Sequence, residues 1–244
     1  LLHGYHTHVP FLTARWEHLV LLNYVCPASL LAPRVPAGTT LDTWRGDTLV
    51  SLVGFMFADT QLLGVPVPFH RTFEEVNLRF YVRRDGPDAR RAVVFVRELV
   101  PRTAIATVAR VVYNEPYLAV PMHHDIALTP ADGGTVRYGW RYADADFEIG
   151  AAVSGPAAAL VPGSEAEFIT EHYWGYTRQR DGSTLEYQVE HPPWDVWQAD
   201  RAWFTGPAAA LYGAAFAEVL SAPPQSALVA VGSPVAVHHG RRLP

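Results

Sequence analysis

Three polar side chains of different chemistry alternate along one short segment of the chain. Glu75, Asn77 and Arg79 place a carboxylate, an amide and a guanidinium at every second position. Alternate residues of a β-strand share a face and lie roughly 7 Å apart, so one small ligand could touch two of them. Arginine binds carboxylates through two parallel hydrogen bonds, and a partly buried glutamate beside it can carry a proton. The pattern predicts either an acid-binding site or the solvated face of an antiparallel sheet.

A second candidate contact lies on a predicted helix over Pro101–Tyr113, which begins with proline and repeats apolar residues at helical spacing. Arg110 and Tyr113 are three residues apart on it and therefore share a face. A buried Arg110 would need a carboxylate or carbonyl partner. That partner is either a ligand or another part of the protein, in which case the contact is a structural ion pair.

Two later segments are rich in aromatic residues and histidine. Tyr173 and Tyr176 follow Glu171 closely, and His191 closes a predicted strand shortly before Trp194. We interpret Tyr173, Tyr176 and His191 as candidate ligand contacts. For His191 the alternative is a packed or solvated side chain, which is the commoner fate of a single histidine at a strand end.

The sequence contains no recognised motif for a metal site or a catalytic nucleophile. Histidines gather at His3, His6 and His8 and again at His123-His124, but neither spacing matches a zinc protease or a deaminase. The single cysteine lies beside a proline in an apolar context, which favours a packing role. We therefore expect no metal and no cofactor.

All 19 basic residues are arginine, because the chain contains no lysine. Schiff-base chemistry and a lysine general base both require a side-chain amine. The composition thus excludes both from the side chains of this protein.

The elements that must position these residues are mostly strands. Apolar runs and alternating patterns bounded by turn residues predict strands, and helical spacing with capping residues predicts a few helices. The expected strands are Leu49–Phe57, Glu75–Arg83, Ala92–Leu99, Thr135–Tyr142, Tyr173–Gln179, Leu185–His191 and Val196–Trp203. The expected helices are Pro27–Leu31, Pro101–Tyr113, Ser164–Glu171 and Pro207–Leu220. The pattern indicates a β-rich α+β domain that spans the whole chain, residues 1–244.

Composition sets the class of protein. With 244 residues and 49% hydrophobic side chains, the chain can bury a sizeable core. A net charge of −5 argues against a general partner among nucleic acids or anionic membranes. The apolar runs are too short to span a bilayer, and we expect a cytoplasmic protein. One cysteine rules out an internal disulfide framework.

Six motifs follow one another in a fixed order along the chain: Trp16-Glu17-His18-Leu19, Pro33-x-Val35-Pro36-x-Gly38-Thr39-x-Leu41-Asp42, Phe73-Glu74-Glu75-Val76-Asn77-Leu78-Arg79-x-Tyr81-Val82, Ala109-Arg110-x-x-Tyr113-x-x-Pro116-Tyr117, Thr170-Glu171-x-Tyr173-x-x-Tyr176 and His191-x-Pro193-Trp194. In this order they resemble the YqjF-like proteins of the uncharacterised DUF2071 family. The resemblance covers roughly residues 13–237, and its most specific element is the run from Glu75 to Val82.

This resemblance implies a relation to acetoacetate decarboxylase, and hence an antiparallel β-barrel around an apolar cavity with a few peripheral helices. Arg110 and Pro116 then match the arginine and proline of the decarboxylase motif, and Glu75 matches its early-strand glutamate. The position of the Schiff-base lysine is taken by Tyr117. The resemblance further implies that the Glu75 face lines the cavity and that Val76, Leu78, Phe80 and Val82 pack outward under helices.

Together these observations favour a protein that binds a small organic acid or an enolisable carbonyl compound without Schiff-base chemistry. Glu75 would be the catalytic proton carrier. The predicted ligand contacts are Asn77, Arg79, Arg110, Tyr113, Tyr117, Tyr173, Tyr176 and His191. The alternatives are a non-catalytic ligand sensor with the same pocket and a scaffold with a filled barrel. The sequence leaves open whether the chain forms a homo-oligomer.

Because no side chain carries an amine, we expect no imine to form. Borohydride treatment with acetoacetate or pyruvate should leave the mass of the folded protein unchanged in intact-protein mass spectrometry. An adduct at the α-amine alone is compatible with this prediction, whereas an adduct mapped to an internal residue would contradict it.

Overall fold

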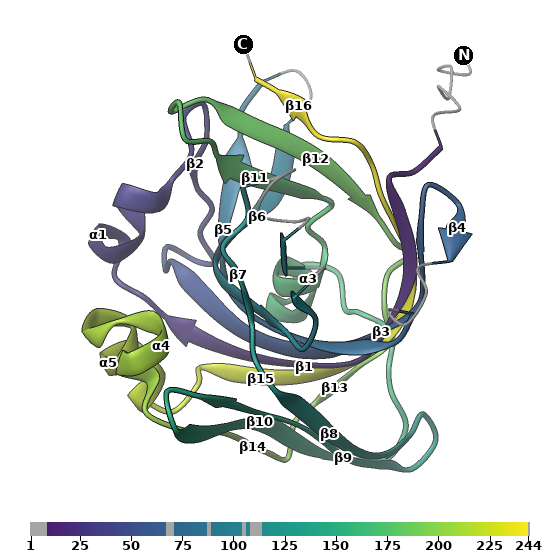
Figure 1. Ribbon diagram of the computed structural model, residues 1–244. Coiled ribbons are helices and arrows are strands. Elements are labelled where there is room, and N and C mark those ends of the chain that lie inside the picture. Colours follow the sequence, from purple (N-terminus) through teal and green to yellow (C-terminus); the bar gives the residue numbers. More distant parts are fainter. Residues whose placement is uncertain (1–8, 67–70, 87–88, 104–105, 108–113, 244) are drawn as a thin grey trace.

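A long sheet that curves into a closed ring forms the body of the protein (Figure 1). The computed structural model describes residues 9–66, 71–86, 89–103, 106–107 and 114–243. Strand pairing runs β15–β1–β3–β5–β6–β11–β12 and returns to β15. Neighbours in this described ring are antiparallel, apart from the parallel pair β6–β11. The ring strands are β1 (Leu12–Val25), β3 (Leu49–Leu62), β5 (Phe73–Arg84), β6 (Arg90–Val100), β11 (Trp174–Arg178), β12 (Thr184–Glu190) and β15 (Ser226–Val237).

Short strands extend the ring, and a second sheet lies along its outer side below β1 and β15 in Figure 1. The short strands are β2 (Thr40–Leu41), β4 (Val65–Pro66), β7 (Tyr117–Ala119), β13 (Val196–Gln198) and β16 (Arg241–Arg242). The second sheet has the order β14 (Arg201–Thr205), β10 (Ala145–Ser154), β9 (Gly133–Tyr142) and β8 (Met122–Thr129). The helices are α1 (Ala28–Leu31), the 3₁₀ turn η1 (Ala32–Arg34), α3 (Glu165–Thr170), α4 (Ala208–Tyr212) and α5 (Ala214–Ser221). None of the helices in the described residues is long and apolar enough to cross a membrane.

Strand β3 is buried on both faces over most of its length, which explains its nearly continuous apolar run. Val50 and Leu52 point outward into a core shared with the second sheet, whereas Val53 and Phe55 point into the ring. A strand covered on both faces reads as apolar throughout instead of alternating. The predicted strand Leu49–Phe57 is therefore confirmed, and it continues to Leu62.

Two irregularities decide which side chains point into the ring. The pairing of β5 with β6 shifts between Leu78 and Arg79, so β6 carries one extra residue opposite this point. An extra residue reverses the alternation of side chains beyond it. As a result both Phe95 and Glu98 of β6 line the interior, although they are three residues apart. In β1, a register shift lies around His18, whose φ is 56°. This shift also reverses the alternation of side chains along its strand.

Helix α3 packs against the interior cluster of the ring. Ser164 caps its first turn, because the Ser164 hydroxyl accepts a hydrogen bond from the backbone N–H of Glu167 at 3.2 Å. Phe168 and Ile169 of this helix belong to the interior apolar cluster of the ring. The carbonyl oxygen of Ile169 accepts a hydrogen bond from Arg79 at 3.3 Å, which places the C-terminal end of α3 beside the polar residues of β5.

Two elements predicted from the sequence are each divided in the structure, and a third lies mostly outside the described residues. The segment Val196–Trp203 is not one strand: it turns at Ala199-Asp200, so β13 joins the ring sheet and β14 joins the second sheet. The segment Pro207–Leu220 is two helices, because Gly213 adopts a φ of 86° between α4 and α5. Most of the predicted helix Pro101–Tyr113 lies outside the described residues.

The outward face of β5 is covered differently from our expectation. Val76, Leu78 and Phe80 share one apolar cluster with Trp140 and Ile149 of the second sheet, as well as with residues of α4 and α5. The apolar cluster on this face thus includes the second sheet as well as helices, and not helices alone. A strand layer offers a broad flat surface, which suits the flat outer face of the ring.

Gly54 allows the two sheets to approach closely, and its replacement gives a test of this packing. A Cβ atom at Gly54 would lie 2.8 Å from Cδ2 of the Tyr138 ring and 3.1 Å from Cγ2 of Ile149. Gly54→Ala should therefore lower the free energy of unfolding by about 1–3 kcal/mol in urea titration.

A double-mutant cycle separates this contact from a local strand effect. Tyr138→Leu removes the ring that the new methyl group would meet, so its combination with Gly54→Ala should cost less than the sum of the two single changes. Strict additivity would show that the two sheets do not meet at Gly54.

Candidate functional site

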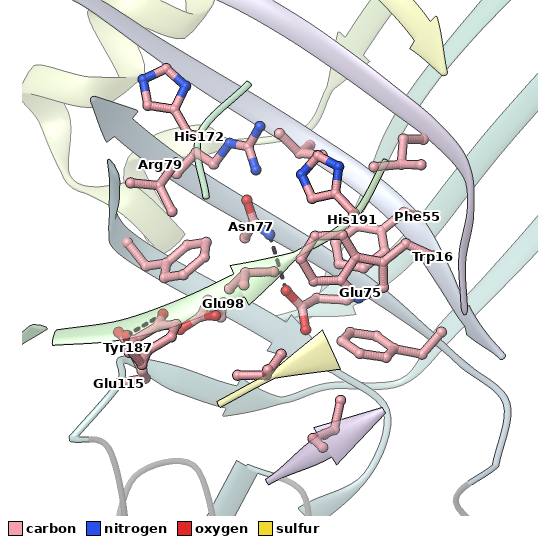
Figure 2. Close-up of a pocket in the computed structure, with 18 of the residues that line it drawn as sticks. Trp16, Phe55, Glu75, Asn77, Arg79, Glu98, Glu115, His172, Tyr187 and His191 are labelled. Atoms are coloured by element: carbon pink, nitrogen blue, oxygen red, sulfur yellow. Dashed lines mark hydrogen bonds between the residues drawn. The ribbon is translucent and has the colours of Figure 1, made fainter. Parts of the chain in front are cut away.

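The ring encloses a cavity of about 270 Å³, and most of its wall is apolar (Figure 2). Strands β1, β3, β5, β6 and β12 all contribute side chains to this wall. Its polar and aromatic side chains include Trp16, Glu75, Asn77, Arg79, Glu98, Glu115, Tyr117, His172, Tyr187, His191 and Trp194. A mainly apolar cavity with a few convergent polar groups is the usual form of a small-molecule site.

Strand β5 supplies the first polar group of the cavity. Glu75, Asn77 and Arg79 are buried, at 3%, 2% and 8% exposure, and all three line the wall. Nδ2 of Asn77 donates to Oε1 of Glu75 at 3.0 Å, and the Tyr117 hydroxyl donates to Oε2 of Glu75 at the same distance. Both carboxylate oxygens of Glu75 are therefore held in place.

Arg79 is a buried cation without a carboxylate within salt-bridge distance among the described residues. One terminal nitrogen donates to the carbonyl oxygen of Ile169, while its Nε has no partner in the described part of the chain. Oδ1 of Asn77, on the same strand face, also lacks a partner there. Buried polar atoms are nearly always hydrogen-bonded in folded proteins, so unpartnered atoms in a cavity wall mark a place for a ligand or water.

A second group of acidic residues lies beside Glu75. Asn77 of β5 pairs with Glu98 of β6, and Glu98 pairs in turn with Tyr117 of β7, so the three residues form one row across the sheet. Glu115 precedes β7 and accepts hydrogen bonds from the hydroxyls of Thr177 and Tyr187, the latter at 2.9 Å. Figure 2 shows Glu98 between Glu75 and the Glu115–Tyr187 pair.

Glycine at position 175 makes room for this arrangement. Gly175 of β11 pairs with Tyr187 of β12, and a Cβ atom at Gly175 would lie 2.2 Å from Cζ of the Tyr187 ring. The ring can therefore cross the backbone of β11 and reach Glu115. The Tyr187–Glu115 hydrogen bond depends on this close approach.

Burial raises the pKa values of all three carboxyl groups. It brings the pKa of Glu75 to about 7, although the donors Asn77 and Tyr117 and the nearby Arg79 oppose the shift. It also brings the pKa of Glu115 to about 7, against the hydroxyls of Thr177 and Tyr187. Burial, then the charges of Glu115 and Glu75, raise the pKa of Glu98 well above its usual value.

These shifts give the carboxyl groups different protonation states near neutral pH. Glu98 keeps its proton, and Oε2 of Glu98 has no hydrogen-bond partner in the described residues. Glu75 and Glu115 are divided between the charged and neutral forms, because their pKa values lie close to 7. A carboxyl group with a pKa near the working pH is suited to accept and return a proton.

The two histidines of the wall are neutral at pH 7. Burial lowers the pKa of His172 to about 4, even though Nε2 lies 3.6 Å from Oδ2 of Asp42. Burial also lowers the pKa of His191, whose ring stacks on that of Trp194 with centroids 4.3 Å apart. Neither imidazole therefore adds positive charge beside Arg79.

The family of the chain follows from a comparison with known protein families. A family model described as "Uncharacterized conserved protein", DUF2071, matches residues 13–235. The chain belongs to the DUF2071 family. The uncharacterized protein YqjF of Bacillus subtilis is 27% identical over 190 residues, which are 76% of this chain and 74% of the relative. This confirms the resemblance drawn from the motifs.

Solved structures show that this DUF2071 chain has the fold of acetoacetate decarboxylase. An acetoacetate decarboxylase-like enzyme from Sphingomonas wittichii RW1 superposes with a TM-score of 0.65 at 13% identity, over 95% of this chain and 92% of that one. The enduracididine biosynthesis enzyme MppR, complexed with pyruvate, gives a TM-score of 0.69 at 12% identity, over 98% and 92%. The predicted β-rich fold is thus confirmed, with a ring-closed sheet at its centre.

The structure brings together five of the residues that the sequence suggested for the site. Glu75, Asn77, Arg79, Tyr117 and His191 all line the cavity. Their roles toward a ligand remain proposals.

Two other predicted contacts lie elsewhere, and two cannot be placed. The hydroxyl of Tyr176 donates to Oε2 of Glu186 at 2.7 Å, in a buried group with Arg84 and Arg90, outside the cavity wall. Tyr173 lies behind His191, with ring centroids 4.8 Å apart, and its hydroxyl donates to Glu171. Arg110 and Tyr113 lie outside the described residues.

Sequence reasoning missed Glu98, Glu115, Tyr187 and Trp16. Alternation along the predicted strand Ala92–Leu99 could not have placed Glu98 beside Phe95 in the cavity wall, because the extra residue in β6 leaves no signal in the sequence. Tyr187 could have been found, since it shares the parity of Leu185, Val189 and His191 in one predicted strand. Glu115 follows the predicted helix Pro101–Tyr113 in the sequence and carried no signal of its own.

No group of three or more His, Cys, Asp or Glu side chains in the described part of the chain could hold a metal ion. The described histidine pair His123-His124 lies in β8, where His124 contacts Glu74 through Nδ1 at 2.6 Å. Glu75 and Glu115 of the cavity accept hydrogen bonds from hydroxyl and amide donors.

The raised pKa of Glu98 predicts an unusual dependence of stability on pH. In the unfolded chain this carboxyl group loses its proton near pH 4.5, whereas in the folded protein it keeps the proton to well above that pH. The folded state thus binds more protons, and its stability falls as the pH rises. Each such group contributes roughly 1.4 kcal/mol per pH unit to this fall.

Glu98→Gln removes one titrating group and keeps the size of the side chain. Urea unfolding at pH 5, 6 and 7 should show a shallower loss of stability than in the original protein, by roughly 1.4 kcal/mol per pH unit. The exposed Glu218 provides the matched control, and Glu218→Gln should leave the slope unchanged. An unchanged slope in Glu98→Gln would mean that Glu98 is ionised in the folded protein.

Proposed function

We propose that the cavity binds a small carboxylic acid with an enolisable carbonyl group, and that Glu75 moves a proton at the carbon next to that carbonyl. Arg79 carries this proposal, because it is a buried guanidinium in the cavity wall with no carboxylate partner among the described residues. A ligand carboxylate would supply the missing counter-charge and accept from the planar guanidinium.

The position of Glu75 supports the proton-transfer step. Glu75 lies four residues from Arg79 on the same strand face, roughly 13 Å away along the backbone. Both side chains extend into the same cavity, where the charge of Arg79 acts on Glu75, so a ligand would bind Arg79 through its carboxylate and turn its acidic C–H bond toward Glu75. The carboxylate of Glu75 would accept the proton while the C–H electron pair forms a C=C bond and the C=O π pair moves to the carbonyl oxygen, giving an enolate, and the reverse step would return the proton.

Glu98 supports the same step from the other side of Glu75. Glu98 lines the cavity, its carboxyl group is neutral and buried, and Oε2 has no hydrogen-bond partner among the described residues. A neutral acid next to a carboxylate base can donate a hydrogen bond to the oxygen on which negative charge develops. The pair thus offers a base on β5 and a donor on the neighbouring strand β6.

Related structures are compatible with a carbonyl ligand. The enzyme MppR, which shares the fold, has been observed with pyruvate and with the condensation product of pyruvate and imidazole 4-carboxaldehyde. Pyruvate is a carboxylic acid with an enolisable carbonyl group. In this chain, which has no lysine, the ligand would be held without an imine to a side chain.

A non-catalytic ligand sensor is the second candidate. The observation that favours it is the state of Glu75, whose two oxygens already accept hydrogen bonds from Asn77 and Tyr117. A carboxylate that is satisfied in this way can be a structural group that shapes the cavity. Binding without proton exchange would distinguish the sensor from the enzyme.

Binding and exchange can be measured on the same ligand, 2-oxobutanoate. Calorimetry should show binding that weakens roughly 30-fold or more in Arg79→Met. The exposed Arg71, which pairs with Asp59, provides the control, and Arg71→Met should bind normally. Binding that is independent of Arg79 would refute the proposed function.

Proton transfer should appear as exchange of the C3 hydrogens of 2-oxobutanoate for deuterium, followed by NMR in D₂O. The rate should rise as the pH increases through about 7, because the base is the ionised form of Glu75 and the pKa of Glu75 is about 7. Glu75→Gln should keep binding and abolish this pH-dependent exchange. Binding without any exchange in the original protein would favour the sensor.

A further inference from the structure

The cavity has an aromatic compartment that the proposed chemistry does not use. It is formed by Trp16, Phe55, Phe57, His191 and Trp194, all of which line the cavity. Trp16 is its centre, with ring centroids 5.3 Å from Phe55, 5.9 Å from Phe57 and 6.3 Å from Trp194. In Figure 2, Trp16 and Phe55 lie on the opposite side of Glu75 from Glu98 and Glu115.

The rings of this aromatic compartment are held in fixed orientations. Nε1 of Trp194 donates to the hydroxyl of Ser233 at 2.8 Å, and Trp194 is 3% exposed. The His191 ring stacks on Trp194 with an angle of 16° between the planes. Trp16 meets Phe55, Phe57 and Trp194 edge to face. The compartment is therefore preorganised, so that a ligand would not have to order it on binding.

One polar atom of this wall lacks a partner. Nε1 of Trp16 is buried and makes no hydrogen bond with any described residue. Buried indole N–H groups normally find an acceptor. An acceptor from a bound molecule would satisfy Trp16 and would place that molecule against its ring.

The volume of the cavity also favours a ligand that reaches the aromatic compartment. A water molecule in the liquid occupies about 30 Å³, so a cavity of about 270 Å³ exceeds the needs of a molecule with six heavy atoms such as pyruvate. A short acid bound at Arg79 would leave the aromatic compartment unfilled. An apolar compartment without a ligand group in it contributes nothing to binding.

We infer that the ligand is an aryl-substituted 2-oxo acid, whose carboxylate lies at Arg79 and whose ring lies in the aromatic compartment beside Trp16. The inference rests on the proposed function, because it extends the same ligand toward the other side of Glu75. An aromatic ring suits the compartment better than an alkyl group, since edge-to-face contacts match the electron-rich face of one ring to the edge of another.

Three ligands test the inference on the unmodified protein by calorimetry. Phenylpyruvate and cyclohexylpyruvate have the same number of heavy atoms and differ only in the aromaticity of the ring, and pyruvate lacks the ring. Phenylpyruvate should bind roughly two- to tenfold more tightly than cyclohexylpyruvate, and at least roughly tenfold more tightly than pyruvate. Equal affinity for the two ring compounds, or stronger binding of pyruvate, would overturn the inference.

Substitutions in the protein test where the aromatic ring of the ligand binds. Trp16→Ala should weaken phenylpyruvate at least roughly tenfold and change pyruvate by less than about twofold. Trp203, which packs against Gly150 in the second sheet, is the control, and Trp203→Ala should affect neither ligand. An unchanged ratio of phenylpyruvate to pyruvate affinity in Trp16→Ala would overturn the placement. The ligand comparison above stands even where Trp16→Ala fails to fold.

Failure of the inference and failure of the proposed function give different results. If Arg79→Met abolishes binding of pyruvate while phenylpyruvate and cyclohexylpyruvate bind equally, the acid site holds and the aromatic selectivity is wrong. If all three acids bind equally well to Arg79→Met and to the original protein, the proposed function itself is wrong.

Discussion

The burial of three carboxyl groups in one apolar cavity is the constraint on which the rest of the site depends. Glu75, Glu98 and Glu115 expose 3%, 2% and 5% of their surface, and none forms a salt bridge in the described part of the chain. A buried, ionised carboxylate without a cation is very costly, so the groups must be hydrogen-bonded or neutral. Both solutions are present, since two glutamates accept from hydroxyl and amide donors and the third holds its proton.

The contrast with another buried glutamate shows that this is a property of the cavity. Glu186 is also fully buried, but Arg84, Arg90 and Arg241 surround it, and the Tyr176 hydroxyl donates to it. Burial alone would raise the pKa of Glu186, yet these partners lower it below its usual value. The fold therefore has arginines available to neutralise a buried carboxylate. It places them on Glu186, whereas among the described residues the acidic cavity residues have only the nearby Arg79.

The sequence predicts the local part of the fold better than the contents of the cavity. Alternation places Glu75, Asn77 and Arg79 on one face because that pattern depends only on the strand itself. Glu98 escapes the same reasoning, since the extra residue in β6 reverses the alternation and is defined by pairing with β5. Likewise, the length of Pro207–Leu220 suggests one helix, but Gly213 divides it through a backbone conformation that composition does not reveal. Contacts between distant segments, such as Tyr187 with Glu115, follow only from the closed ring.

The absence of lysine and the raised pKa values are linked through Tyr117. Tyr117 is the residue that the motif resemblance aligns with the Schiff-base lysine of acetoacetate decarboxylase. In this structure its hydroxyl donates to Glu75 and lies beside Glu98 in the pairing of β7 with β6. A charged amine at that point would stabilise ionised carboxylates and lower their pKa values. A tyrosine is neutral, and burial raises its own pKa well above the usual value, so it supplies a hydrogen bond without a charge.

Replacing an amine by a phenol in this setting removes the electron sink that an imine provides and leaves carboxyl groups that can hold protons near neutral pH. Under the proposed function, this combination would move a proton on a bound acid and would not break a carbon–carbon bond through an imine to a side chain.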